Sequence, residues 1–314
     1  MKVRIGVGMG AVGPGDADGF ARMVDDLDEL GFDSIWLPEV LTAPVLDPLT
    51  GLAFAAAHNP NLKLGATMLL PGRDPVRLAK ELATLDVLSH GRLLTTFVLG
   101  RPGGPAPGAA GAIDAGKGKT GRGKTDRGKT DGGKKGALMD EMLPVLRRLW
   151  AGETVSHHGA SATFDQVTLA PLPVQQPLEF WTGGMAPAAL ARCGRFADGW
   201  LPSACTPAEA AGGKAAIDEE AHAAGRAISP EHFGVSIAYA ARPLQPQVVR
   251  ALIANRRGVD PERVVPVGID GLRSLLEAFL AVGFSKFVVR PLESPGSWRA
   301  ELEALACGVL DLQA

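Results

Sequence analysis

The chain has 314 residues, of which 46% are hydrophobic and 21% charged, and its formal net charge is −2. This composition is typical of a globular protein with a sizeable core, and the near-neutral charge gives no argument for nucleic-acid or membrane binding. No stretch approaches 18 uninterrupted apolar residues, so we expect no transmembrane helix. Its three cysteines, Cys193, Cys205 and Cys307, have no paired spacing. They indicate thiols rather than disulfides, and we expect a cytoplasmic protein.

Short apolar strands alternate with amphipathic helices along most of the chain. The pattern predicts principal strands at residues 3–9, 33–38, 62–69, 92–99, 178–181, 199–201, 233–240 and 286–290. It predicts helices at residues 16–30, 47–58, 74–88, 138–150, 187–196, 207–225, 247–255, 270–282 and 298–310. Successive parallel strands need such helical crossovers. We therefore predict one α/β domain over residues 1–314, a (β/α)8 TIM barrel, with a doubly wound open sheet as the alternative.

Two segments interrupt this alternation. Residues 152–176 are predicted to form a hairpin excursion from the barrel. Residues 101–136 begin as a loop rich in Pro, Gly and Ala and continue as repeats that hold eight Lys or Arg against two Asp. Because such a composition cannot bury apolar surface, we expect a low-complexity, disordered insertion after the fourth strand.

The lysine-rich repeats match the pattern G-x-x-x-x-G-K-[ST] twice, starting at Gly118 and at Gly123. A phosphate-binding P-loop lies between an apolar strand and an apolar helix, whereas polar repeats flank both matches. We therefore predict no nucleotide-binding loop here. Clustered cations could bind a polyanion without sequence specificity, but a solvated surface insertion is the favoured interpretation, and we expect no specific nucleic-acid partner.

In a (β/α)8 barrel the active site lies at the C-terminal ends of the strands. In this sequence those ends are mostly apolar or glycine, without a nucleophile paired to a base and without metal-ligand spacing, so no metal site is predicted. Glu39 is either an active-site carboxylate or a structural acceptor of backbone N–H groups. Arg290 contacts either a ligand or a salt-bridge partner. Such a mouth is typical of an enzyme whose bound cofactor supplies the chemistry.

A glycine turn at residues 182–185 joins the fifth strand to the helix that begins at Pro187. Backbone N–H groups and the positive end of a helix favour an anion, such as the phosphate of a cofactor. The alternative is a plain turn in which Gly183 and Gly184 only provide the required geometry. On these residues alone both interpretations stay open.

A series of motifs covers most of the chain outside residues 101–136 and 207–265. They are FDSIWLPE (32–39), DPLTGLAFAAA (47–57), LGATMLLP (64–71), PVRLAKELATLDVLS (75–89), GRL (91–93), MDEMLP (139–144), and TGG (182–184) followed by DGW (198–200). Taken together and in this order, they resemble the bacterial-luciferase-like family of flavin- and deazaflavin-dependent oxidoreductases. The stretch GFSKFVVRPL (283–292) is similar to a subgroup that depends on coenzyme F-420, an 8-hydroxy-5-deazaflavin.

The resemblance implies a barrel that binds the cofactor ring at its C-terminal mouth and transfers a hydride between coenzyme F-420 and a small organic substrate. Glu39 would be a catalytic proton donor or an electrostatic anchor. A non-proline cis peptide in a bulge at Thr67–Met68 would lie against the ring. The alternatives are a reduced-FMN-dependent monooxygenase and a catalytically impaired relic, the latter because Val40 replaces a frequent histidine. The family leans towards homodimers, which is a further expectation.

The resemblance also favours the phosphate interpretation of the glycine turn over the plain turn. The cofactor-binding residues that it implies lie at strand ends and in this turn. They are Met9, Glu39, Ala66, Thr67, Met68, Gly100, Thr182, Gly183, Gly184 and Met185.

Overall fold

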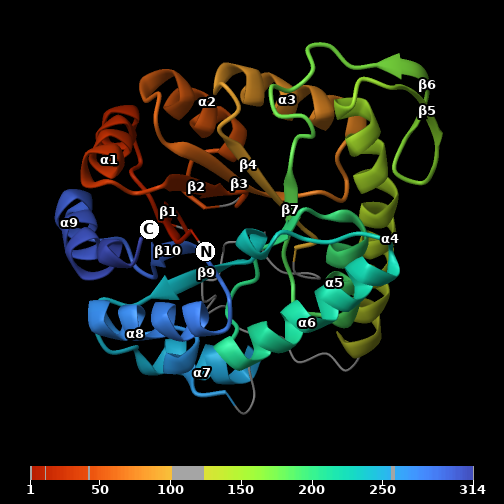
Figure 1. Cartoon of the computed structure of the whole chain (residues 1–314). Coiled ribbons are helices and arrows are strands. Elements are labelled where there is room, and N and C mark those ends of the chain that lie inside the picture. Colours follow the sequence, from red (N-terminus) through yellow and green to blue (C-terminus); the bar gives the residue numbers. More distant parts are fainter. Residues whose placement is uncertain (1, 11, 42, 101–123, 256–258, 314) are drawn as a thin grey trace.

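Parallel strands form the central sheet of the computed structural model, which describes residues 2–10, 12–41, 43–100, 124–255 and 259–313. Within these residues the eight strands are β1 (Arg4–Gly8), β2 (Ser34–Pro38), β3 (Lys63–Leu69), β4 (Leu93–Val98), β7 (Phe180–Thr182), β8 (Gly199–Trp200), β9 (Gly234–Tyr239) and β10 (Lys286–Pro291). Their order is β8-β7-β4-β3-β2-β1-β10-β9. Isolated parallel bridges, Trp200–Phe233 and Ser203–Ser236, join the two edges. The ring is nearly closed (Figure 1), and the predicted TIM barrel is confirmed.

The helices surround this ring (Figure 1). They are α1 (Ala17–Leu30), α2 (Pro48–His58), α3 (Pro75–Leu88), α4 (Lys124–Trp150), α5 (Pro187–Phe196), α6 (Pro207–Ala223), α7 (Pro246–Asn255), α8 (Gly268–Ala281) and α9 (Trp298–Val309). Asp47 caps α2, as predicted, because its side chain accepts a hydrogen bond from the Thr50 N–H and Pro48 occupies the first turn. None of the described helices has the length and apolar character that a membrane span requires.

The predicted hairpin is also present, as β5 (Thr154–His158) paired antiparallel with β6 (Thr163–Thr168). It lies outside the ring of helices, beside α4 (Figure 1). Glu141 of α4 fixes the hairpin, since its carboxylate accepts hydrogen bonds from the Ser161 N–H at 2.9 Å and pairs with His157 at 2.8 Å.

Helix α4 begins earlier than the sequence predicts. The expected disordered insertion lies partly outside the described residues, at 101–123, but residues 124–136 belong to the helix. This part of the expectation is wrong. The buried Arg192 donates to the carbonyl of Gly136 at 3.1 Å and to the Asp140 carboxylate at 2.7 Å, which fixes the helix against α5. Once a helix has formed, each further residue adds a hydrogen bond without a new nucleation cost.

Two tryptophans fill the middle of the barrel together with Leu201 and Val288. Trp36 of β2 pairs in register with Gly65 of β3, and a Cβ atom at position 65 would lie 2.0 Å from the indole ring. Trp181 of β7 pairs in the same way with Gly199 of β8, where a Cβ atom would lie 2.4 Å from the ring. Each indole therefore occupies the space that the paired glycine leaves free.

Gly65→Ala should lower the free energy of unfolding by about 3 kcal/mol, because the new methyl group collides with the Trp36 indole and displaces it from its packed position. Gly212→Ala is the matched control, since an alanine there meets no neighbouring atom and replaces glycine in an exposed position of helix α6. It should be neutral or stabilising by up to about 1 kcal/mol. Urea denaturation of both variants measures the difference, and equal stabilities would contradict the packing described here.

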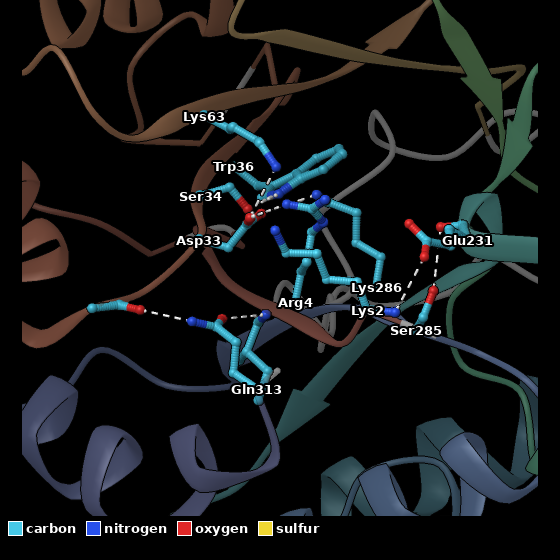
Figure 2. A network of polar contacts seen from close by, with 12 residues as sticks. Lys2, Arg4, Asp33, Ser34, Trp36, Lys63, Glu231, Ser285, Lys286 and Gln313 are labelled. Carbon is cyan, nitrogen blue, oxygen red and sulfur yellow. Dashed lines mark hydrogen bonds and ion pairs between the residues drawn. The ribbon is translucent and has the colours of Figure 1, made fainter.

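A charged cluster closes the N-terminal end of the barrel (Figure 2). The Asp33 carboxylate contacts Lys63 Nζ and Lys286 Nζ at 3.0 Å each and Arg4 Nη1 at 3.4 Å. Burial alone would raise the pKa of Asp33, but the charges of Lys286 and Lys63 lower it to about 2. Burial lowers the pKa of Lys286 to about 8 against the opposing effect of Asp33. One carboxylate thus links the beginnings of four neighbouring strands, β10, β1, β2 and β3.

Asp33→Asn should lower the free energy of unfolding at pH 7 by about 3 kcal/mol, because it leaves buried Lys286 without its counter-charge. The wild-type carboxylate contributes its full stabilisation, about 2 kcal/mol, above its ordinary pKa of 3.8, and loses it as the pH falls through about 2. Urea denaturation at several pH values measures this loss. The free energy of unfolding of the variant should not show the decrease that Asp33 causes in the wild type between pH 3.8 and about 2. Asp165→Asn, which removes an exposed pair with His158, should change stability by less than about 1 kcal/mol.

Candidate active site

A cavity of about 130 Å³ lies at the C-terminal ends of the strands, where the barrel architecture predicts the active site. All eight strands of the described barrel, or the residues directly after them, contribute to its wall. The lining residues are Gly8, Met9, Trp36, Pro38, Thr67, Val98, Gly183, Gly184, Leu201, Ser203, Ser236, Val288 and Arg290. The wall is therefore apolar apart from three hydroxyl groups and one guanidinium.

The glycine turn forms one side of this cavity. Gly184 has a φ of +104°, a conformation that glycine adopts without strain, and a Cβ atom at Gly183 would lie 2.9 Å from Val98 Cγ1. Trp200 Nε1 donates to the carbonyl of Gly184 at 3.0 Å and holds the turn in place. Helix α5 follows with Ala186 as its N-cap, and no described side chain caps this end. Its first N–H groups are thus suited to bind an anion.

The predicted cofactor-binding residues divide into two groups. Met9, Thr67, Gly183 and Gly184 line the cavity. The remaining predicted residues are not part of this lining: Glu39, Ala66, Met68, Gly100, Thr182 and Met185.

Strand alternation explains why Ala66 and Met68 lie elsewhere. Successive side chains point to opposite faces of a strand, so residues on either side of Thr67 face the helices instead of the cavity. Ala66 and Met68 are both fully buried in the main core between the sheet and its helices.

The expected cis peptide at Thr67–Met68 is wrong. The cis bonds in the described residues are Ala170–Pro171 and Gln176–Pro177, and the bond after Thr67 is trans. Strand β3 continues regularly past this point, because Thr67, Met68 and Leu69 keep their register with β4. No bulge is therefore present there.

Glu39 lies behind the wall of the cavity. Its carboxylate accepts a hydrogen bond from the Leu69 N–H at 2.7 Å and an ion pair from Arg73 Nη2 at 2.5 Å, and its side chain is 8% exposed. It thereby joins the end of β2 to the segment after β3. This is the structural interpretation that the sequence had left open beside the catalytic one.

Arg290 has no hydrogen-bond or ion-pair partner among the described residues, although it is only 9% exposed. Burial lowers the pKa of its guanidinium to about 10. Of the two alternatives that the sequence left open, the salt bridge is therefore not found in the part of the chain that is described. Arg290 is also the one side chain of the cavity lining that carries a charge at neutral pH.

Trp36, Ser236 and Val288 also line the cavity, although they were not among the residues predicted from the sequence. Trp36 lies two residues before Pro38 on β2, and Val288 lies two residues before Arg290 on β10. Ser236 lies three residues before the end of β9 at Tyr239. Counting back by two from the strand ends would have found Trp36 and Val288, because alternate side chains share a face. The described residues hold no group of three or more side chains placed to bind a metal ion.

The family model for luciferase-like monooxygenases matches residues 2–274 of the chain. The chain therefore belongs to this family, as the motifs had indicated.

Three individual proteins illustrate the similarity. An uncharacterized protein of Mycobacterium tuberculosis is 29% identical over 167 residues, which are 52% of each chain. The oxygenase component of the flavin-dependent trigonelline monooxygenase of Acinetobacter baylyi is 28% identical over 156 residues, 48% of this chain and 38% of that one. An F420-dependent secondary alcohol dehydrogenase, solved with an F420-acetone adduct, superimposes with a TM-score of 0.76 at 16% identity over 100% of both chains. The chain spans about half the length or less of the curated relatives it matches.

Glu39→Gln should reduce the free energy of unfolding by about 1–2 kcal/mol, because a neutral amide weakens the bonds to the Leu69 N–H and to Arg73. Cofactor affinity should change little, since Glu39 is not in the cavity wall. Arg73→Met is the matched variant and should have a similar effect on stability, and the double variant should cost less than the sum. A loss of turnover at unchanged stability would instead assign Glu39 a catalytic role.

Proposed function

We propose that the protein is an oxidoreductase that transfers a hydride between coenzyme F-420 and a small organic substrate. The observation that carries this proposal is the composition of the cavity, which combines an anion-ready glycine turn with an apolar wall and offers no acid–base pair of side chains. Such a site depends on a bound cofactor for its reactivity. The deazaflavin supplies or accepts the hydride when it is bound.

In this proposal the residues of the mouth bind the cofactor, orient the substrate and shield the reacting ring from water. The N–H groups after Gly184 hold the cofactor phosphate. Trp36, Val98 and Val288 provide the apolar surface that keeps water from the reacting ring, and the hydroxyl groups of Ser203 and Ser236 orient the substrate. The similarity of residues 283–292 to the F-420-dependent subgroup supports the choice of cofactor.

A reduced-FMN-dependent monooxygenase is the second candidate. The trigonelline relative is flavin-dependent by its name, and the same glycine turn would accept the phosphate of FMN as readily as that of the deazaflavin. The two proposals differ in the cofactor and in the need for oxygen, and they share the same binding residues.

Titration of the purified protein with coenzyme F-420 and, separately, with FMN tests both candidates. We expect micromolar binding of the deazaflavin and at least roughly tenfold weaker binding of FMN, a difference of about 1.4 kcal/mol. The reverse order would favour the monooxygenase. If the protein binds neither cofactor, the result would favour the third alternative, a catalytically impaired relic.

Gly184→Val should weaken cofactor binding at least roughly tenfold, because valine strains the backbone at a φ of +104° and its Cβ atom would lie 3.1 Å from Ala189 Cβ. Gly225→Val is the matched control, since Gly225 also has a positive φ, +68°, but follows helix α6 away from the cavity. It should lower stability and leave cofactor affinity unchanged. Full cofactor affinity in the Gly184 variant would show that this turn does not hold the phosphate.

A further inference from the structure

The Arg290 side chain extends past two glycines at the end of the neighbouring strand, and Gly10 leaves room for its guanidinium. A Cβ atom at Gly10 would crowd Arg290 Nη1 at 3.0 Å, whereas a Cβ atom at Gly8 would be in ordinary contact with Arg290 Cβ at 3.6 Å. Both glycines belong to β1 or to the residues directly after it, next to the strand β10 that carries the arginine. The side chain therefore extends along the end of β1 within the mouth of the barrel.

The contrast with Arg192 shows how unusual this environment is. Arg192, which is 4% exposed, binds the Asp140 carboxylate at 2.7 Å and the Gly136 carbonyl at 3.1 Å. Arg290 is almost as deeply buried and has no such partner among the described residues. A buried charge without a partner is costly. At the mouth of the barrel, a negatively charged ligand can provide the partner that the Arg290 guanidinium lacks.

The rest of the cavity wall adds polar groups of the right kind. Ser236 of β9 pairs in register with Val288 of β10, and Ser203 pairs with Ser236, so both hydroxyl groups belong to the same side of the mouth as Arg290. No carboxylate is present among the lining residues. One guanidinium and two hydroxyl groups together favour an oxyanion.

The position of Arg290 separates it from the glycine turn. The turn follows β7, and the strands β8 and β9 lie between β7 and β10 in the ring. The mouth thus has two features suited to negative charge, on different strands. A cofactor phosphate at the turn leaves Arg290 available for a second anionic group.

We propose that Arg290 binds an oxyanion group of the substrate, so that the substrate class is an organic anion that bears a carboxylate, a phosphate ester or a sulfonate. This inference rests on the proposed function, because it assigns the glycine turn to the cofactor. Arg290 is then the residue that determines substrate specificity, with Ser203 and Ser236 as supporting hydrogen-bond donors.

The unpaired charge has a consequence for stability that a structural arginine would not show. Arg290→Met replaces an uncompensated buried cation by an apolar side chain and should leave Tm unchanged or raise it in the ligand-free protein. Arg192→Met breaks an ion pair and should lower Tm. A Tm loss in Arg290→Met as large as in Arg192→Met would overturn the assignment of Arg290 as unpartnered.

Calorimetric titration of the cofactor-free protein with sodium acetate, phosphate and sulfate tests the binding directly. The Gly184→Val background removes the glycine turn, so that the remaining anion affinity belongs to Arg290. In this background Arg290→Met should lower the affinity for at least one of the three anions by roughly tenfold or more. Arg290→Lys should retain part of it, and Arg242→Met, which removes an exposed arginine outside the cavity, should have no effect. Equal anion affinity with and without Arg290 would overturn the proposal.

Two further measurements keep this test separate from the proposed function. If coenzyme F-420 and FMN both fail to bind, the proposed function fails, whereas the anion titration still decides the role of Arg290. If Arg290→Met abolishes F-420 binding while Gly184→Val retains it, Arg290 holds the cofactor phosphate and the proposal is wrong.

Gly10→Ala is a second test of the anion site that keeps the arginine. The new methyl group crowds Arg290 Nη1 without removing the charge, so this variant should lower anion affinity several-fold.

Discussion

The packing of two indole rings against two glycines inside the barrel is the constraint on which the rest of the structure depends. Trp36 lies over Gly65 and Trp181 over Gly199, and each pair spans neighbouring strands in register. Because a slip of one residue would turn the tryptophan towards the helices, this packing fixes how β2 meets β3 and how β7 meets β8. The same indoles separate the charged end of the barrel from its open mouth, so Trp36 is at once a core residue and the floor of the cavity.

The barrel axis therefore has three chemically different layers. At the N-terminal end, Lys286 and its neighbours share the charge of Asp33 (Figure 2). Aromatic and aliphatic side chains fill the middle. At the C-terminal end, Arg290 stands without a described counter-ion beside a wall of small and apolar residues. A single strand, β10, carries Lys286, Val288 and Arg290 on its inner face and passes through all three layers. The Lys286 charge is compensated by Asp33 at the N-terminal end of the barrel. The Arg290 charge has no described counter-ion at the C-terminal end, where it is available to a ligand.

The sequence was sufficient for the fold because apolar strands alternate with amphipathic helices along the chain, and a first-turn proline or a capping side chain marks the start of most of these helices. It also placed Gly183 and Gly184 at the mouth, since Pro187 marks the start of the helix after them. It could not place Glu39, whose partner Arg73 comes from another part of the chain, nor show that Arg290 lacks one. The beginning of α4 was missed because polar repeats have no helical periodicity, although Arg192 fixes the helix from outside. These features depend on register and on contacts between distant segments, which local patterns do not encode.

The position of Trp36 gives the molecule an optical probe of its own. It is the one tryptophan among the residues that line the described cavity, whereas Trp150 and Trp200 are buried in the core outside the barrel. A flavin or deazaflavin bound in the mouth as proposed would be close enough to this indole to accept its excitation energy. The difference in tryptophan quenching between the wild type and Trp36→Phe would thus report whether the floor of the cavity is covered, without any added label.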